Sequence, residues 1–253
     1  MTRICKILSS FTLTIALLCI SSSIVNGQKP TVKDVYFCGH IGEVATYWKN
    51  GKVTYLTDGK NRAFATAIKV IGDDIYVAGI EFKDYLPVAK YWKNEIATSL
   101  TDGSSDVFVN DIIIVGNDIY VVGYENYHSI SVATYWKNGV ATYLTDRKVN
   151  TDATALVIIG NDIYVALTER ESSGLSVAKY WKNGVVTTLK NDNTYSSTYA
   201  TSMTVSDDNV YIVGYEFHGP GFVAKYWKNS VAISLTDGKN SATAKAIIDL
   251  FPI

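Results

Sequence analysis

Short runs of apolar residues, rich in β-branched and aromatic side chains, alternate with turn-forming residues from residue 34 onward. Within residues 64–101 the runs are 64–71, 74–81, 88–94 and 95–101. Runs of about six residues with this composition are typical of strands in a sheet. The pattern therefore predicts four strands, which we call a, b, c and d in chain order.

Pairs of turn-forming residues link a to b and c to d. Such pairs supply the positive φ angles of two-residue hairpin turns. The pairs are Gly72-Asp73, Gly116-Asn117, Gly160-Asn161 and Asp207-Asp208 between a and b, and Asn50-Gly51, Asn138-Gly139 and Asn183-Gly184 between c and d, with Asn94-Glu95 and Asn229-Ser230 as weaker versions. The expected fold class is therefore antiparallel all-β. The connections from b to c and from d to a are longer and less uniform, which predicts variable loops.

The strand pattern repeats five times. Each copy of strand c carries the motif Val-Ala-x-Tyr-Trp-Lys-Asn, and these copies contain all five tryptophans: Trp48, Trp92, Trp136, Trp181 and Trp227. Each copy of strand b begins with an Asp-Ile-Tyr-like motif: Asp34-Val35-Tyr36, Asp74-Ile75-Tyr76, Asp118-Ile119-Tyr120, Asp162-Ile163-Tyr164 and Asn209-Val210-Tyr211. A fixed period of about 45 residues indicates a repeat architecture.

The chain begins in a strand b and ends in a strand a. Ala244-Lys245-Ala246-Ile247 follows Asp237 at the spacing that separates Ala65 from Asp58. Pairing this last strand with the first strand b completes a fifth unit and closes a ring, which leaves no exposed sheet edge between the ends. We therefore predict a five-bladed β-propeller of four-stranded antiparallel blades, with blade one shared between the two ends of the chain, as one domain spanning residues 28–253.

The order of motifs within a unit resembles kelch-type blades without their paired glycines. The chain also resembles secreted bacterial proteins with tandem Tyr-Trp-Lys-Asn-Gly repeats, over about residues 33–250. This resemblance implies a β-propeller and no particular activity. Five-bladed propellers include tachylectin-like lectins, which bind amino sugars, and glycosidases with three carboxylates near the central axis. The resemblance thus leaves a lectin and a hydrolase as alternatives.

Residues 1–27 have the pattern of a secretory signal peptide. Arg3 and Lys6 precede an apolar run over residues 11–20, and Val25-Asn26-Gly27 offers a cleavage site. The alternative is an uncleaved anchor, but the run is about half of the roughly 20 residues that a membrane-spanning helix needs. We expect a secreted or periplasmic protein without a membrane span after cleavage.

The composition and net charge limit the classes of partner that are expected. Of the 253 residues, 47% are hydrophobic and 19% are charged, as expected for a globular chain. Removal of the signal takes two basic residues and no acidic one, so the formal charge of −1 becomes −3. This argues against nucleic acid or an anionic membrane as a partner. Cys38 alone remains after cleavage, so no internal disulfide is expected.

Variable loops on a rigid scaffold are common sites of binding. The b-to-c and d-to-a connections emerge on one rim, where a glutamate recurs and Ile41 takes its place in the first copy. The candidate ligand-binding residues on this rim are Glu81, Glu125, Glu169, Glu216, Tyr124, Tyr127, Tyr215 and Phe217. The favoured interpretation of these glutamates is a solvated strand end or a bond to a neighbouring turn, and ligand contact is the alternative.

For the other conspicuous residues, the favoured interpretation is a structural role. The tryptophans are predicted to pack between blades, because their context is the same in every copy. The aspartates that end strand d, such as Asp58 and Asp102, are predicted to form side-chain turns with the backbone. Asp111 is predicted to be a polar residue in the lining of the central channel, with a catalytic acid as the alternative. Cys38 is expected to be a buried, inert thiol, and the three histidines (His40, His128 and His218) are expected to lie in surface loops without a metal.

We therefore expect a secreted, non-enzymatic binding protein, with a glycan as the favoured ligand, and predict no catalytic residue, metal or cofactor. A monomer is expected. The alternatives are a structural or protein-interaction scaffold of the cell envelope or extracellular space and, with less support, a hydrolase.

Overall fold

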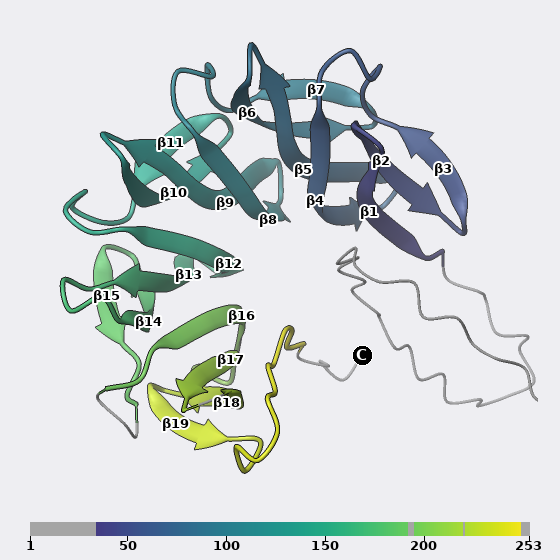
Figure 1. Ribbon diagram of the computed structural model, residues 1–253. Coiled ribbons are helices and arrows are strands. Elements are labelled where there is room, and N and C mark those ends of the chain that lie inside the picture. Colours follow the sequence, from purple (N-terminus) through teal and green to yellow (C-terminus); the bar gives the residue numbers. More distant parts are fainter. Residues whose placement is uncertain (1–33, 192–194, 220, 249–253) are drawn as a thin grey trace, which may run out of the picture.

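The computed structural model describes residues 34–191, 195–219 and 221–248. The signal peptide predicted for residues 1–27 lies outside them. The described residues form 19 strands in five antiparallel sheets (Figure 1). They contain no helix that is long and apolar enough to cross a membrane. The predicted all-β architecture of five blades is confirmed.

Each sheet is one blade, and its strands follow in chain order from the centre outward. Blade one consists of β1 (Tyr36–Ile41), β2 (Val44–Lys49) and β3 (Lys52–Tyr55). Blade two consists of β4 (Ala63–Ile71), β5 (Asp74–Lys83), β6 (Leu86–Lys93) and β7 (Ile96–Ser99). Blade three consists of β8 (Val107–Val115), β9 (Asp118–Tyr127), β10 (Ile130–Lys137) and β11 (Val140–Tyr143).

The last two blades repeat this order. Blade four consists of β12 (Thr151–Ile159), β13 (Asp162–Arg170), β14 (Ser176–Lys182) and β15 (Val185–Thr188). Blade five consists of β16 (Thr198–Ser206), β17 (Asn209–His218), β18 (Gly221–Lys228) and β19 (Val231–Ser234). The strands a, namely β4, β8, β12 and β16, line the centre and pack against one another in sequence (Figure 1).

The predicted two-residue turns are present, but the prediction of long b-to-c loops is wrong for most blades. Strands b and c continue pairing to the tip of a hairpin, as in the pairing of Lys83 with Leu86. The turn there is only Asp84-Tyr85, both with positive φ, and blade three has the same kind of turn at His128 and Ser129. Blade four alone has a longer connection, residues 171–175. Hairpin length therefore varies between blades, and the d-to-a connections are the true loops.

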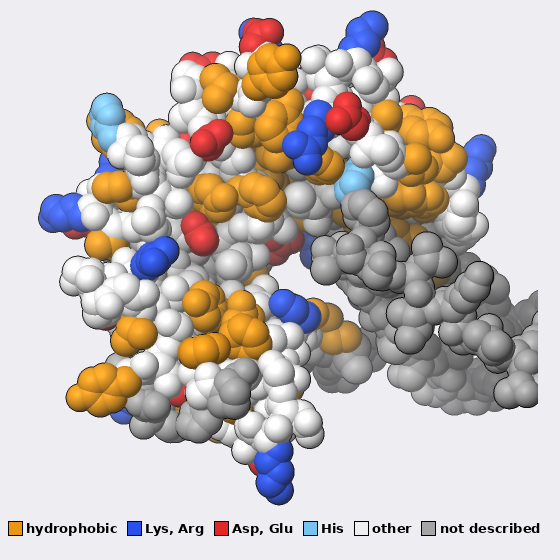
Figure 2. Space-filling view, in the orientation of Figure 1, with side chains coloured by type: hydrophobic (Ala, Val, Ile, Leu, Met, Phe, Trp, Pro, Cys, Tyr) orange, Lys and Arg blue, Asp and Glu red, His pale blue; other side chains and the backbone are white. Residues whose placement is uncertain are grey.

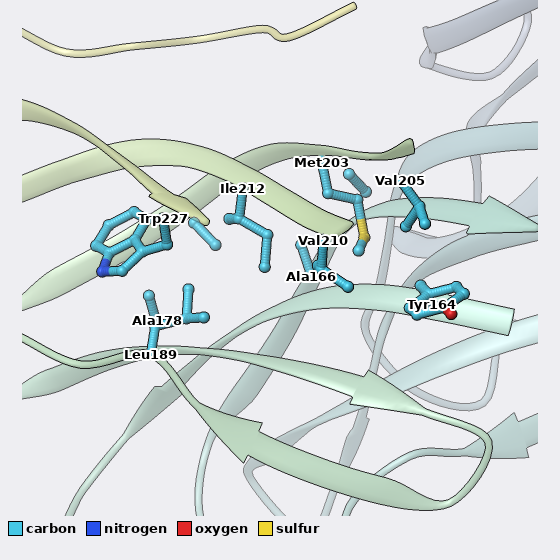
Figure 3. Packing of buried hydrophobic residues seen from close by; sticks show 11 residues of the cluster. Tyr164, Ala166, Ala178, Leu189, Met203, Val205, Val210, Ile212 and Trp227 are labelled. Carbon is cyan, nitrogen blue, oxygen red and sulfur yellow. The ribbon is translucent and has the colours of Figure 1, made fainter. Parts of the chain in front are cut away.

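The tryptophans lie at the interfaces between blades. Each of Trp92, Trp136, Trp181 and Trp227 belongs to a buried cluster that includes residues of the preceding blade. Figure 3 shows Trp227 beside Ala178 and Leu189 of blade four. Trp48 is only half-buried and belongs to none of the buried clusters among the described residues.

The Lys-Asn turn of the repeated motif closes onto the start of strand b. In blade two the Asn94 side chain accepts from the Ile75 N–H at 2.8 Å and donates to Asp74 at 2.7 Å. Lys93 forms an ion pair with Asp74 at 2.8 Å and lies over the Tyr76 ring. The same set of contacts recurs in blades one, three and four. The two repeated motifs are therefore halves of one contact.

Strand a of each four-stranded blade carries a β-bulge. The register shifts between Ala65 and Ala67 in blade two, which leaves Thr66 as the extra residue. The bulge brings the backbone of strand a close to strand b, and a Cβ at Gly79 would lie 2.0 Å from the Phe64 carbonyl oxygen. Glycine occupies this position in blades two, three and five for this steric reason, whereas blade four has Leu167 there. The equivalent residues are Gly123 and Gly214.

The C-terminal segment lies against blade five in the way that each strand a lies against the preceding blade. Ala242 N–H donates to the Phe222 carbonyl, as Ala63 N–H donates to that of Glu43. The side chain of Thr201 donates to the Ala244 carbonyl at 2.7 Å. Residues 241–248 form no strand, and no hydrogen bond within the described part of the chain joins them to β1. Their order in the ring matches the predicted closure, and the last step, pairing with β1, remains a prediction.

Candidate ligand-binding site

A cavity of about 1200 Å³ lies at the centre, where the strands a of the blades meet. The bulges supply part of its wall, because each one turns an extra polar side chain toward the cavity. These residues are Thr66, Asn110, Thr154 and Thr201. Cys38, Gly39 and His40 of β1 and Lys245 of the C-terminal segment also line it. Residues from all five blades therefore contribute to one central site.

Aromatic side chains surround the cavity near the start of the strands a. Phe64, Phe108 and Tyr199 occupy the same repeat position and all line the wall. Phe108 stacks on Tyr124 with centroids 5.8 Å apart and an interplanar angle of 10°. Tyr199 stacks on Tyr215 at 4.9 Å and 21°. Two stacked cross-strand pairs thus contribute aromatic rings to this part of the cavity wall, with Tyr124 behind Phe108.

Blade four breaks the aromatic series. Asp152 takes the position of Phe64, Phe108 and Tyr199, and Thr168 lies opposite it on β13. The lining nearby is polar and comes from residues Ser131, Asn150, Arg170 and Ser176. In Figure 2 hydrophobic side chains gather over β8–β9 and over β16–β17, with acidic and basic side chains between them over β12–β13. The cavity therefore has a polar sector flanked by two apolar ones.

The carboxyl of Asp152 makes no hydrogen bond and no ion pair in the part of the chain that the structure describes. Burial disfavours its charged form and raises its pKa. The pKa of Tyr124 is also raised, mainly by burial and then by the charges of Asp152 and Asp106. Asp152 is thus an available acceptor at the edge of the aromatic wall.

The glutamates predicted as ligand contacts lie away from this wall. Three of them form ion pairs with a lysine of the adjacent strand c: Glu81 with Lys90 at 2.5 Å, Glu169 with Lys179 at 2.5 Å and Glu216 with Lys225 at 2.6 Å. Glu125 faces a threonine at the lysine position and instead accepts from Ser105 and Tyr143. None of the four lines the central cavity, although Glu81 and Lys90 border a smaller hollow of about 310 Å³ beside blade two.

The predicted aromatic residues divide into two groups. Tyr215 lines the cavity and Tyr124 supports Phe108 beside it. Tyr127 lies at a hairpin tip with its ring 4.5 Å from the guanidinium of Arg147, and Phe217 is exposed and packs on Phe222. Only the first group belongs to the central site.

Sequence reasoning missed Phe64, Phe108, Tyr199 and Asp152. These four residues are the second residue of each strand a, a position that lies outside the repeated motifs of strands b and c. An aromatic residue in three of the four strands a, with a carboxylate in the other, was the available signal.

Asp111 bridges two blades and does not line the cavity. One carboxylate oxygen accepts from the Ile112 N–H at 2.8 Å, and the other accepts from the Leu156 N–H of the next blade at 3.4 Å. Burial raises its pKa, and the charge of Lys69 partly offsets the effect. The backbone bonds explain the residue without a catalytic role.

The aspartates after strand d form the predicted side-chain turns. Asp58, Asp102, Asp146 and Asp237 each accept from the N–H two residues later, as in the 2.8 Å bond from Ser104 to Asp102. This prediction is confirmed.

Cysteine and histidine provide no second site. Burial raises the pKa of the Cys38 thiol to about 12, so it stays protonated at neutral pH. His40 packs edge-on against Phe64, His128 lies in an exposed turn, and the side chain of His218 is not described. No cluster of three potential metal ligands occurs among the described residues.

No family model matches the chain, and no curated protein matches it. Among solved structures, the chain is similar to TolB from Acinetobacter baumannii, with 10% identity and a TM-score of 0.45 over 80% of this chain and 62% of that chain. It is also similar to a puromycin-hydrolyzing peptidase from Mycobacterium tuberculosis, with 12% identity and a TM-score of 0.44 over 72% of this chain and 30% of that one. The chain thus spans less than two thirds of either structure.

Proposed function

We propose that this protein is an exported, non-enzymatic binding protein that holds a glycan in its central cavity. The stacked pairs Phe108–Tyr124 and Tyr199–Tyr215 carry the proposal. The C–H faces of a sugar ring pack well on flat aromatic rings, while hydroxyls need the polar groups that blade four offers nearby. A wall of this mixed character suits a ligand that is apolar on its faces and polar at its edges.

The size of the cavity favours a ligand of several units. At about 1200 Å³ it exceeds the roughly 300–1,000 Å³ of ordinary small-molecule pockets. An oligosaccharide fits this space better than a single sugar. The lining set has one carboxyl, Asp152, whereas hydrolysis of a glycosidic bond uses two at a separation of roughly 5–10 Å. This supports binding over catalysis.

A glycan array with residues 28–253 tests the proposal. The wild-type protein is expected to bind a subset of glycans, and Phe108→Ala and Tyr199→Ala are each expected to weaken binding on the order of tenfold, because each removes one stacking face. Tyr55→Ala is the matched control, since Tyr55 is an exposed aromatic on β3. Absence of binding to any glycan would end the glycan proposal, and equal losses in all three variants would place the site elsewhere.

A protein-interaction scaffold is the second candidate function. The first residue of strand d is apolar and exposed in four blades: Ile96 (73%), Val140 (69%), Val185 (65%) and Val231 (54%). A repeated apolar position on the outer edge offers a surface for a partner. The candidate gains support if a purified partner binds the wild type and if lysines at these four positions abolish that complex while leaving glycan binding unchanged.

A further inference from the structure

We propose that the polar sector at blade four is a subsite for an organic cation, such as a protonated amine or a quaternary ammonium group. This inference deepens the proposed function and rests on the central cavity being the binding site. Three consecutive blades present Phe108, Asp152 and Tyr199 at the same repeat position on adjoining inner strands. In the order of the blades, a carboxylate thus stands between two aromatic residues.

The chemistry of these three groups selects a positive charge. An aromatic face attracts a cation through its quadrupole, with an effect that grows when water is excluded. The Asp152 carboxylate adds a full negative charge, and its partial burial leaves that charge poorly solvated. A bound cation replaces the missing solvation, and a neutral ligand does not.

The basic residues of the cavity do not already occupy this position. Lys245 lies over the Tyr215 ring, 5.5 Å from its centroid. Arg170 is exposed at the end of β13, and no ion pair joins either residue to Asp152 in the described part of the molecule. Arg170→Gln removes a cavity-lining cation from the same blade as Asp152. This variant is expected to bind a cation at least as tightly as the wild type does.

Isothermal titration with choline and with 3,3-dimethylbutan-1-ol tests the subsite. The two molecules have the same shape, and only the first carries a charge. We expect choline to bind roughly tenfold more tightly, as one cation–π contact combined with an ion pair predicts. Asp152→Asn is expected to remove most of this preference. Asp73→Asn is the matched control, because it changes an exposed turn residue to the asparagine that blades three and four have there.

The outcomes separate this inference from the proposed function. Equal affinity for the two probes, or a choline preference that survives in Asp152→Asn, would overturn the cation subsite. If a neutral glycan binds in the array and depends on Tyr199 while choline shows no preference, the subsite falls and the glycan proposal stands. If neither glycans nor choline bind, both fall. Thermal unfolding of Asp152→Asn verifies that any loss of binding occurs in a folded protein.

Discussion

At the residue scale, the glutamates of strand b take part in contacts within their own blade. In blade five Glu216 and Lys225 are 3% and 1% exposed and form an ion pair at 2.6 Å. The lysine was visible in the sequence as the x of Val-Ala-x-Tyr-Trp. What the sequence did not show is that the two residues lie diagonally across neighbouring strands on the same face, since that depends on register.

Breaking this buried pair is expected to destabilise the protein. Lys225→Met leaves the Glu216 carboxylate buried without its cation, which costs about 3–5 kcal/mol of unfolding free energy. The double variant Lys225→Met/Glu216→Leu removes both charges and is expected to recover most of the loss. Urea denaturation measures both. A single variant that is no less stable than the double one would contradict the structural role of the pair.

Asp152 is expected to lower stability at neutral pH, as an unpaired group in a binding site often does. Burial raises its folded-state pKa above the unfolded value, so its ionisation opposes folding. This destabilisation is absent below the pKa of Asp152 in the unfolded state, and it develops as the pH rises from there through the pKa in the folded state. Asp152→Asn should therefore raise the melting temperature at pH 7 and leave it unchanged at about pH 3. Equal melting temperatures at pH 7 would contradict the raised pKa.

At the element scale, turn chemistry was readable from the sequence and hairpin length was not. Asn-Gly and Gly-Asn pairs predicted the a-to-b and c-to-d turns because few residues accept positive φ. The two-residue tips of the b-to-c hairpins were not predicted. Asp84-Tyr85 and His128-Ser129 have positive φ, although these residue types disfavour that conformation. Cross-strand pairing on both sides holds them there, which sequence preference alone does not reveal. The bulges of strand a were likewise not predicted.

Ser230 occupies a turn position where the other blades mostly have glycine. Its φ is 71°, and its backbone carbonyl accepts a hydrogen bond from the Lys190 N–H at 2.9 Å. Ser230→Gly removes the side chain that disfavours this conformation and is expected to stabilise the protein by about 0.5–1 kcal/mol. For a domain of this size, each kcal/mol raises the melting temperature by roughly 2–4 °C. Differential scanning calorimetry measures the shift. Gly139→Ser, the reverse change in blade three, should lower the melting temperature, and an unchanged value in both would refute the strain.

At the scale of the whole molecule, the number of blades follows from the repeat, whereas the site depends on how the blades differ. Each of the five tryptophans marks one blade. The polar sector of the cavity, in contrast, contains Asp152, which replaces the aromatic residue of the other strands a in blade four alone among the described strands a. Residues far apart in sequence become neighbours only when the ring is assembled. This is why the sequence pattern indicates a rim of variable connections but does not indicate the aromatic pairs around the cavity.

Ring closure is testable through the single cysteine of the predicted mature chain. Ala67 pairs with Ala78 in blade two, and the equivalent pair in a closed blade one is Ala246 with Cys38. Cross-strand neighbours lie about 4.5–5.5 Å apart at Cα, which suits a disulfide. Under mild catalytic oxidation Ala246→Cys should therefore form a disulfide with Cys38. Ile247→Cys should stay reduced, because its equivalent Ile68 pairs with Val77 and its side chain therefore points to the other face of the sheet. A free thiol at Cys38 in the Ala246→Cys variant would contradict closure.

The central claim is that the cavity enclosed by the strands a is the ligand site. A crystal structure of residues 28–253 grown with a glycan that binds in the array tests it most directly. We predict electron density for the glycan in the cavity, with a sugar ring against Phe108 or Tyr199. An empty cavity, with the glycan held on the outer strands or at the ion-paired glutamates, would contradict the claim.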